Sequence, residues 1–394
     1  MSVQTSQVTS CVSRYAARLH EATGTGHQVA SPLGAWLLLA LAGPASNGTD
    51  RAALTDALGC DVEAAAQAAA DLLGSPHPLV ASAAAVWTDP AAPLPDSFAR
   101  WRAGLPTAVT TGDLPSQAGL DAWARDHTFG LIDKFPIQAD HLYLVLASAL
   151  ATKVSWTVPF DLTSAAALGT GSLWAGRLGR VLRTPARSGG HAQFIAATQQ
   201  AGDVIVHIAA AAGGLEVVSV AAMPEVQAGH VLAAAYDIAS AHAAGQRIDR
   251  RDLASLPLGE SPLWKVREFT ATADSCSAVL PAWSATSRID LTAPGLGFAA
   301  AKHALVRNDD PWQAGQAAMA RYTRTGFEAA AVSAIAVMAA ARLPARHREV
   351  LLRFGHPYAV VAVTTDTSAY SGPWHGLPVF SAWVSEPDDA AGDE

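Results

Sequence analysis

The chain has 394 residues, half of them hydrophobic, with eleven Trp and a formal net charge of −8. This much apolar sequence is enough for one large core and argues against disorder. The acidic balance excludes nucleic acid as a general partner, because binding to phosphates needs a surplus of Lys and Arg. Apolar runs such as 35–41 are too short to span a membrane, so no membrane contact is expected.

The three cysteines, Cys11, Cys60 and Cys276, are far apart in the sequence and form no CxxC pair. Such spacing predicts inert thiols rather than a metal site or a disulfide framework. The N-terminal segment 1–7 has no basic region followed by an apolar stretch. We therefore predict no signal peptide and a cytoplasmic protein.

In the first half of the chain, hydrophobic spacing and capping residues predict both helices and strands. Apolar positions at helical spacing predict a helix over 8–22. Ser31 as a cap and Pro32 in the first turn predict the start of a second, buried helix. A third helix over 50–58 is closed by Gly59. The other elements predicted here are a strand over 80–87, a helix over 120–126 and a central strand over 143–153.

From about residue 194 onward the sequence is rich in strand-forming residues. Two strands over 203–209 and 215–223 are joined through Gly213-Gly214, which is a hairpin signal. Shorter strands are predicted over 279–283, 289–291, 358–363 and 378–384. No linker or internal repeat is visible, so we predict one mixed α/β domain over 1–387, followed by a solvated acidic tail over 388–394.

Motifs for catalysis, cofactor binding and metal binding are missing from the sequence. There is no dinucleotide fingerprint, phosphate loop, zinc-protease motif or nucleophile elbow. No carboxylate pair stands out as an acid–base couple. We expect no cofactor and no metal ion. Enzymatic activity is the least supported function, although an active site made only of a shaped apolar pocket would leave no motif.

Six separated segments resemble, in the right order, segments of the serpin family, and together they span nearly the whole chain. They are 30–59 with Ala-Ser-Pro-Leu, 123–132 with W-x4-T-x-G-x-I, 144–161 ending in W-x2-P-F, 326–331 with Gly-Phe-Glu-Ala-Ala-Ala, 354–358 and 379–387. The chain is similar to a diverged, bacterial-type member. The resemblance implies a mixed α/β (α+β) fold with a large central β-sheet, further β-sheets, surrounding helices and an exposed reactive-centre loop between about Gly326 and Phe354.

In inhibitory serpins a serine protease attacks this loop, and the cleaved loop inserts into the central sheet as an added strand. The resemblance assigns the hinge of the loop to Gly326, Phe327, Glu328, Ala329, Ala330 and Ala331. In an inserted strand Phe327, Ala329 and Ala331 would face the core, because alternate residues of a strand point to opposite faces.

Family spacing places the scissile bond after Ala340, which suits a serine protease with a small pocket. The other candidate positions are Ala341 and Arg342. Arg342 and Arg346 would suit a trypsin-like protease, while the alternative for the run 342–348 is a solvated basic loop. A serine protease is thus the partner that the resemblance implies, and we expect the protein to be a monomer.

The residues that correspond to the region where the sheet opens are Ser31, Ser148, Trp156 and Gln316. The family usually has Asn where Ser148 stands and His where Gln316 stands. Phe327 replaces a small residue, which costs ~1–3 kcal/mol through overpacking unless the sheet has a matching cavity. These departures keep open a second function, a non-inhibitory serpin-fold protein that binds a partner or a small hydrophobic ligand, including one co-opted in a biosynthetic pathway.

Overall fold

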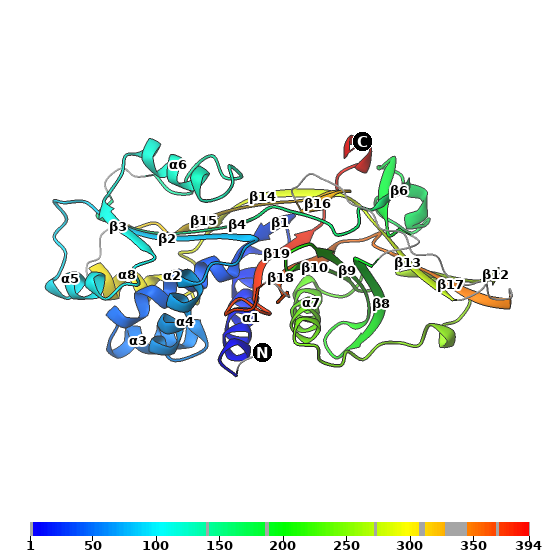
Figure 1. Ribbon diagram of the computed structural model, residues 1–394, viewed down its shortest axis with the longest axis horizontal. Coiled ribbons are helices and arrows are strands. Elements are labelled where there is room, and N and C mark those ends of the chain that lie inside the picture. The colour runs from blue at the N-terminus through cyan, green and yellow to red at the C-terminus, as the bar shows by residue number, and fades with distance from the viewer. Residues whose placement is uncertain are drawn as a thin grey trace.

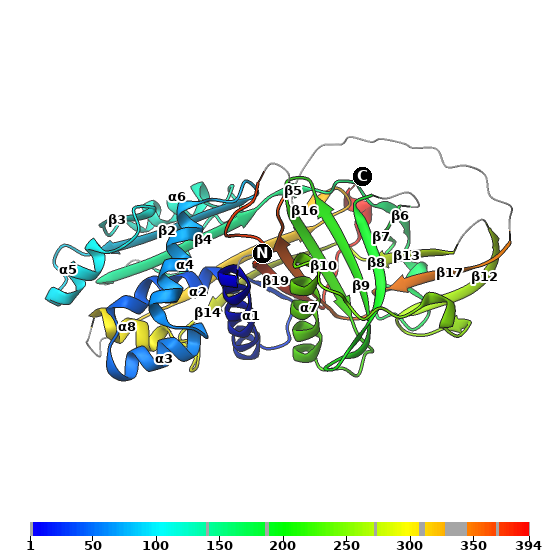
Figure 2. The ribbon, with the colours of Figure 1, turned by 60° about the horizontal axis from the view of Figure 1, so that its bottom comes forward.

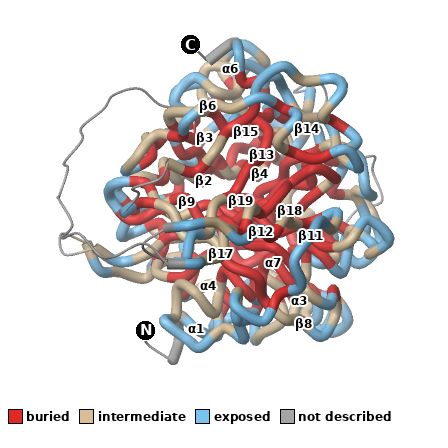
Figure 3. Tube along the Cα trace, turned by 90° about the vertical axis from the view of Figure 1, so that its right-hand side faces the viewer, coloured by how far each residue is buried: buried red, intermediate tan, exposed pale blue. Residues whose placement is uncertain are grey.

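The computed structural model describes residues 3–138, 142–185, 189–271, 274–306, 312–327, 345–367 and 370–393. Within them the expected mixed α/β fold is confirmed, in an elongated molecule whose sheets run through its middle (Figure 1). Buried residues are concentrated in the strands and in the helices packed against them (Figure 3). The helices are α1 (Val3–Thr23), α2 (Pro32–Ala42), α3 (Gly48–Leu58), α4 (Val62–Gly74), α5 (Asp96–Ala103), α6 (Gln117–Asp126), α7 (Ala228–Ala243) and α8 (Phe298–Val306). None of the helices in these ranges is long and apolar enough to cross a bilayer.

The central sheet consists of two parts that lie side by side (Figures 1 and 2). One part has the strand order β3-β2-β4 and the other β14-β15-β16-β5. β4 and β5 are separated in the sequence only by Lys153, so one nearly continuous strand runs from the first part of the sheet into the second. The strands are β2 (Val80–Thr88), β3 (Val109–Asp113), β4 (Leu144–Thr152), β5 (Val154–Ser155), β14 (Trp283–Asp290), β15 (Gly315–Tyr322) and β16 (Gly326–Phe327).

Different helices cover the two faces of the β3-β2-β4 part. Ala84 and Val86 of β2 belong to the main core, together with α2, whereas Ala85 and Trp87 pack with α6. This separation follows from the two-residue period of a strand, which sends neighbouring side chains to opposite faces. Figure 1 accordingly shows α6 on one side of the sheet and α2, α3 and α4 on the other.

A second sheet, with the order β1-β19-β18-β10-β9-β8, packs against α7. A third, with the order β11-β12-β17-β13-β7-β6, extends toward one end of the molecule (Figure 2). The strands of the second sheet are β1 (Gln28–Ala30), β8 (His191–Thr198), β9 (Gly202–Ala211), β10 (Leu215–Ala221), β18 (Tyr358–Thr364) and β19 (Pro378–Val384). Those of the third are β6 (Asp161–Ser164), β7 (Arg180–Arg183), β11 (Gly259–Glu260), β12 (Trp264–Ala271), β13 (Ser275–Leu280) and β17 (Ala345–Arg353).

Several local predictions are confirmed by the backbone. The Ser31 hydroxyl caps α2 by accepting a hydrogen bond from the amide of Gly34 at 3.3 Å. Gly59 ends α3 with a φ of 72°, a left-handed conformation that favours glycine. Gly213 and Gly214, with φ of 100° and 97°, form the turn between β9 and β10.

Two predicted short strands are wrong. Segment 279–283 is a junction, because β13 ends at Leu280 and β14 begins at Trp283. Pro281 lies between them and has no amide hydrogen with which to continue a ladder. Segment 289–291 is not a separate strand, since Ile289 lies near the end of the long strand β14.

Asp388 and Asp389, the first residues of the predicted solvated tail, are exposed but hydrogen-bonded to the domain. The Asp388 amide donates to the carbonyl oxygen of Ala282 at 2.8 Å. The Asp389 carboxylate accepts hydrogen bonds from the amides of Gly179 at 2.6 Å and Arg180 at 3.1 Å. Ala390 is fully buried. These acidic residues are docked because they satisfy backbone groups, including amides where β7 begins.

The predicted exposed loop over 326–354 is also wrong at both ends. Gly326 and Phe327 are buried and form β16. Residues 345–353 form β17, which pairs with β12 and β13, and its Val350 and Leu352 are fully buried. The alternative of a solvated basic loop over 342–348 is therefore wrong from residue 345 onward. The remainder of the predicted loop, 328–344, lies outside the described residues.

Candidate functional site

The two parts of the central sheet are separated along most of their length. β4 pairs with β2, and β15 pairs with β14, but in the described ranges no ladder joins β4 to β15. Their facing edges instead line a groove of about 380 Å³, which α2, α6 and α8 also border. Large apolar side chains that line the groove include Trp123, Leu142, Leu146, Phe298, Leu305 and Trp312.

On both strands that border the groove, β4 and β15, the even-numbered side chains point toward the main core. On β4, Leu146 and Leu150 are part of that core or pack against it, while Val145 and Ala147 pack with α6. On β15, Ala318, Ala320 and Tyr322 belong to the main core. A strand placed between the two edges would therefore have one face toward α2 and the other toward α6.

β16 closes one end of the groove. Gly326 pairs with Ser155 and Phe327 with Val154, and Phe327 also pairs with Tyr322 of β15. These two residues thus occupy the place of a missing strand between β5 and β15. Only this end of the opening is filled by a strand in the part of the chain that the structure describes.

The Phe327 side chain has a site of its own in the core. It is 4% exposed, and its ring meets the edge of Trp283 with centroids 6.2 Å apart. The Trp283 ring in turn stacks on Tyr322, with 12° between the ring planes. The core therefore has space for a large side chain at position 327.

Trp156 fixes the turn that leads into β16. Its indole Nε1 donates to the carbonyl oxygen of Thr323 at 3.0 Å, and its amide donates to that of Thr325 at 3.0 Å. The side chain is 4% exposed and packs against Phe160 and Tyr322. Backbone and ring contacts therefore both hold the chain in front of Gly326.

A second set of polar contacts, which we call the Ser31 cluster, lies along the groove and comprises Ser31, Gly34, Ser148 and Gln316. The Gln316 side chain of β15 forms two hydrogen bonds with the backbone of Ser31. The Ser148 hydroxyl of β4 donates to the carbonyl oxygen of Gly34 at 2.8 Å. The start of α2 is thus hydrogen-bonded to both edges of the opening.

The structure brings together three of the four residues expected where the sheet opens. Ser31, Ser148 and Gln316 meet in the Ser31 cluster, whereas Trp156 lies beside β16 at the closed end. Of the expected hinge, Gly326 and Phe327 are described. The hinge residues Glu328, Ala329, Ala330 and Ala331 and the candidate scissile positions Ala340, Ala341 and Arg342 lie outside the described residues.

The sequence analysis missed a histidine pair behind the closed end. His191 Nδ1 of β8 and His207 Nε2 of β9 are 3.1 Å apart, and both rings contact Phe160. Burial lowers the pKa of both imidazoles, most strongly that of the fully buried His207, so we expect both to be neutral at pH 7. The antiparallel register places Gln193, and not His191, opposite His207, so the pair is diagonal and no local sequence signal suggested it.

Comparison with solved structures defines the class of this architecture. The chain is similar to the thermophilic serpin Tengpin in the native state, at 12% identity and a TM-score of 0.64, over 97% of this chain and 94% of that one. It is similar to human thyroxine-binding globulin complexed with thyroxine, at 10% identity and a TM-score of 0.67, over 98% and 100%. It is also similar to cleaved Serpin 42Da, at 13% identity and a TM-score of 0.61, over 98% of both chains.

These structures establish that the chain has the serpin fold, as the six sequence segments implied. No family model matches the sequence, and no curated protein matches it. The structural neighbours include a protein that binds a small molecule as well as a cleaved serpin. The fold is therefore established, and the function has to be argued from the site.

Proposed function

We propose that this protein is a serine protease inhibitor that is cleaved in the segment 328–344 and then inserts that segment into the groove between β4 and β15. The observation that carries this proposal is the position of β16. The first two hinge residues already occupy the place of a strand between β5 and β15, and the rest of the groove is open. An inserted strand would extend β16 along the edges of β4 and β15, which no ladder joins among the described residues.

The buried position of Phe327 supports insertion despite the size of this residue. Overpacking is costly only when a side chain has no matching space, and the Phe327 ring fits against Trp283. Continuing the alternation from Phe327, Ala329 and Ala331 would face α2 and the Ser31 cluster. Their small side chains suit a groove that is bordered on that side by Gly34.

The target that we propose is a serine protease with a small pocket, which would cleave after Ala340. A trypsin-like protease that cleaves after Arg342 is the alternative. The protein itself would supply only the scissile bond, and the protease would supply the catalytic groups.

The test is incubation with small-pocket and trypsin-like serine proteases, followed by denaturing electrophoresis and thermal unfolding of the cleaved product. We expect a covalent complex that resists SDS and a markedly higher melting temperature after cleavage, since an inserted strand adds backbone hydrogen bonds and buried apolar area. Cleavage without a complex and without a rise in melting temperature would refute insertion.

Two matched variants sharpen this test. Ala331→Arg would place a charged side chain toward the core and should turn the inhibitor into a plain substrate, because burying an unpaired charge is costly. Glu328→Arg would point to the opposite face, at a position that already carries a charged side chain, and should leave trapping nearly unchanged. Equal behaviour of the two variants would contradict the proposed alternation.

The apolar lining of the groove supports a second function, binding of a small hydrophobic ligand. Its volume of about 380 Å³ falls in the range of ligand pockets, and one structural neighbour is a thyroxine-binding globulin. Fluorescence titration with an apolar naphthalene dye would test this. Saturable binding that Leu146→Arg abolishes, together with no covalent protease complex, would favour the ligand-binding function.

A further inference from the structure

Two cysteines that are distant in the sequence meet where α1 packs against the turn between α3 and α4. Cys11 Sγ is 3.4 Å from the carbonyl oxygen of Gly59, the residue bonded to Cys60. The Cys60 Sγ lies 3.9 Å from the carbonyl oxygen of Leu58, so both sulfurs lie against the same end of α3. Cys11 is fully buried, Cys60 is partly exposed, and both are free thiols. The sequence analysis predicted inert thiols and did not anticipate that these two cysteines lie at the same turn.

Arg14 completes the site. Its Nη2 lies 2.5 Å from the Gly59 carbonyl oxygen and 3.6 Å from Cys11 Sγ. The hydrogen bond from Cys60 and the nearby guanidinium outweigh burial and lower the pKa of Cys11 to about 6, while the same sulfur and burial raise the pKa of Cys60. The lowered pKa favours the thiolate of Cys11, and the thiolate is the form that takes part in thiol–disulfide exchange.

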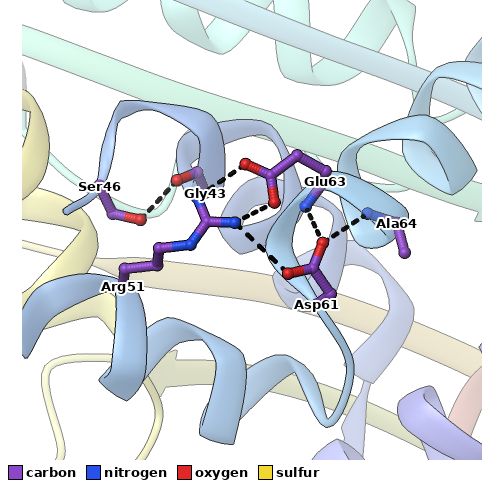
Figure 4. A network of polar contacts seen from close by, with 6 residues as sticks. All are labelled: Gly43, Ser46, Arg51, Asp61, Glu63 and Ala64. Carbon is purple, nitrogen blue, oxygen red and sulfur yellow. Dashed lines mark hydrogen bonds and ion pairs between the residues drawn. The ribbon is translucent and has the colours of Figure 1, made fainter. Parts of the chain in front are cut away.

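Contacts of Asp61, the residue after Cys60, hold the turn between α3 and α4 in place (Figure 4). The Asp61 carboxylate caps α4 by accepting hydrogen bonds from the amides of Glu63 at 3.0 Å and Ala64 at 3.4 Å. Arg51 of α3 binds the carboxylates of both Asp61 and Glu63. Arg14 of α1 and Arg51 of α3 therefore both hold the turn, and this keeps Cys60 close to Cys11.

We propose that Cys11 and Cys60 are a redox modification site, which low-molecular-weight disulfides such as glutathione disulfide convert reversibly into a disulfide bond between α1 and the α3–α4 turn. Neither residue borders the groove of the proposed function, so this inference does not depend on it.

The exchange begins at Cys60, whose sulfur is the more exposed of the two. Cys60 passes its proton to Cys11 and attacks one sulfur of glutathione disulfide, so that a mixed disulfide forms and one glutathione thiolate leaves with that proton. Cys11 is thereby left as a thiolate, which attacks the Cys60 sulfur and displaces the second glutathione as a thiolate. This glutathione takes a proton from water, which replaces the proton that the cysteine pair lost when Cys11 ionised. The cysteine pair loses two electrons, and glutathione disulfide gains them.

Cys276 provides an internal control. It lies on β13 in the third sheet, and burial raises its pKa to about 12. Unlike Cys60, it has no second cysteine beside it to take its proton, and a thiol with so high a pKa then reacts slowly because the thiolate is the nucleophile. Under conditions that oxidise the pair, we therefore expect Cys276 to stay reduced.

The experiment equilibrates the reduced full-length protein in buffers of increasing glutathione disulfide to glutathione ratio at pH 7. After an acid quench and alkylation, intact mass and peptide mapping count the remaining thiols. We expect two thiols to disappear together, a linked peptide pair containing Cys11 and Cys60, and recovery of both thiols with dithiothreitol. If all three thiols survive the most oxidising buffer, or if a stable adduct on Cys60 forms without the link, the proposal is wrong.

Four variants test the roles of Cys11, Cys276 and Arg14. Cys11→Ser should accumulate the mixed disulfide on Cys60, because no second sulfur displaces the glutathione, and Cys276→Ser should behave like the unchanged protein. Arg14→Gln should slow formation of the disulfide at pH 6.5 by several-fold, and Arg14→Lys should restore part of the rate. A Cys11→Ser protein that forms no adduct, or an Arg14→Gln protein that reacts at the original rate, would contradict the mechanism.

Discussion

The side-chain amide of Gln316 in β15 forms hydrogen bonds, through both its oxygen and its nitrogen, with the backbone of Ser31 at the start of α2. The Ser31 amide donates to Gln316 Oε1 at 2.9 Å, and Gln316 Nε2 donates to the Ser31 carbonyl oxygen at 2.8 Å. The Ser31 hydroxyl donates to the carbonyl oxygen of Val379 in β19 at 2.9 Å. One residue at a helix start is thus connected to the edge of the groove and to the second sheet.

Replacing Gln316 by Ala should destabilise the protein by about 1–3 kcal/mol, because both backbone groups of Ser31 would lose their partner. Urea unfolding measures the change. Gln67→Ala is the control, since Gln67 is exposed on α4 and its side chain donates to Asp71 at 2.8 Å. We expect that control to change stability by about 0.3 kcal/mol. An equal loss of unfolding free energy in the two variants would show that the hydrogen bonds between Gln316 and Ser31 contribute little to stability.

Trp156→Ala should cost about 3–5 kcal/mol, because it removes a large buried ring. Trp156→Phe keeps most of the ring volume and should cost less, chiefly through the lost hydrogen bond from Nε1 to the Thr323 carbonyl oxygen. Denaturant unfolding of both variants checks the order. A nearly neutral Trp156→Ala would mean that the turn before Gly326 is held by other contacts.

Acidification should destabilise the protein through His20. This imidazole is buried beside the Ser381 hydroxyl, with 2.7 Å between Nε2 and Oγ, and burial lowers its pKa from 6.5 to about 4. Between these two values the unfolded chain binds a proton that the folded protein does not. The unfolding free energy should therefore fall as the pH drops from about 6.5 to about 4, by at most about 3 kcal/mol from this residue.

Unfolding experiments across this pH range compare the protein with His20→Asn and with His230→Asn. The first variant should flatten the pH dependence, because it removes the buried titrating group. The second changes an exposed histidine and should leave the slope as it was. A slope unaffected by His20→Asn would assign the effect to other groups.

Limited digestion with trypsin should cleave the chain after Arg342 before it cleaves after Arg346 or Arg348. The backbone of β17 is paired with β12 from residue 345 onward, and a protease needs a substrate strand whose backbone groups are free. We expect the first cut after Arg342 and protection of Arg346 and Arg348 until the protein unfolds. Mass spectrometry of early digests gives the order, and an early cut after Arg346 would contradict the position of β17.

The sequence by itself determined the features that depend on neighbouring residues. Ser31 and Pro32 mark the start of α2, because a side-chain acceptor and a fixed φ act within one helical turn. The apolar run after Tyr143 predicts a buried strand, and the order of six weak segments predicts the fold. Such signals survive in a single sequence because their physical causes act over only a few residues.

Only the tertiary structure decided which distant groups meet. The space for Phe327 exists because Trp283, which stacks on Tyr322, borders it, and Trp283 lies on another strand far from Phe327 in the sequence. The site of Cys11 and Cys60 likewise exists because α1 packs against the end of α3. The same holds for β17, whose basic and apolar residues are as typical of a loop as of a strand until β12 and β13 pair with it. Packing sets these contacts, since the fit between side chains depends on the whole core and not on the local sequence.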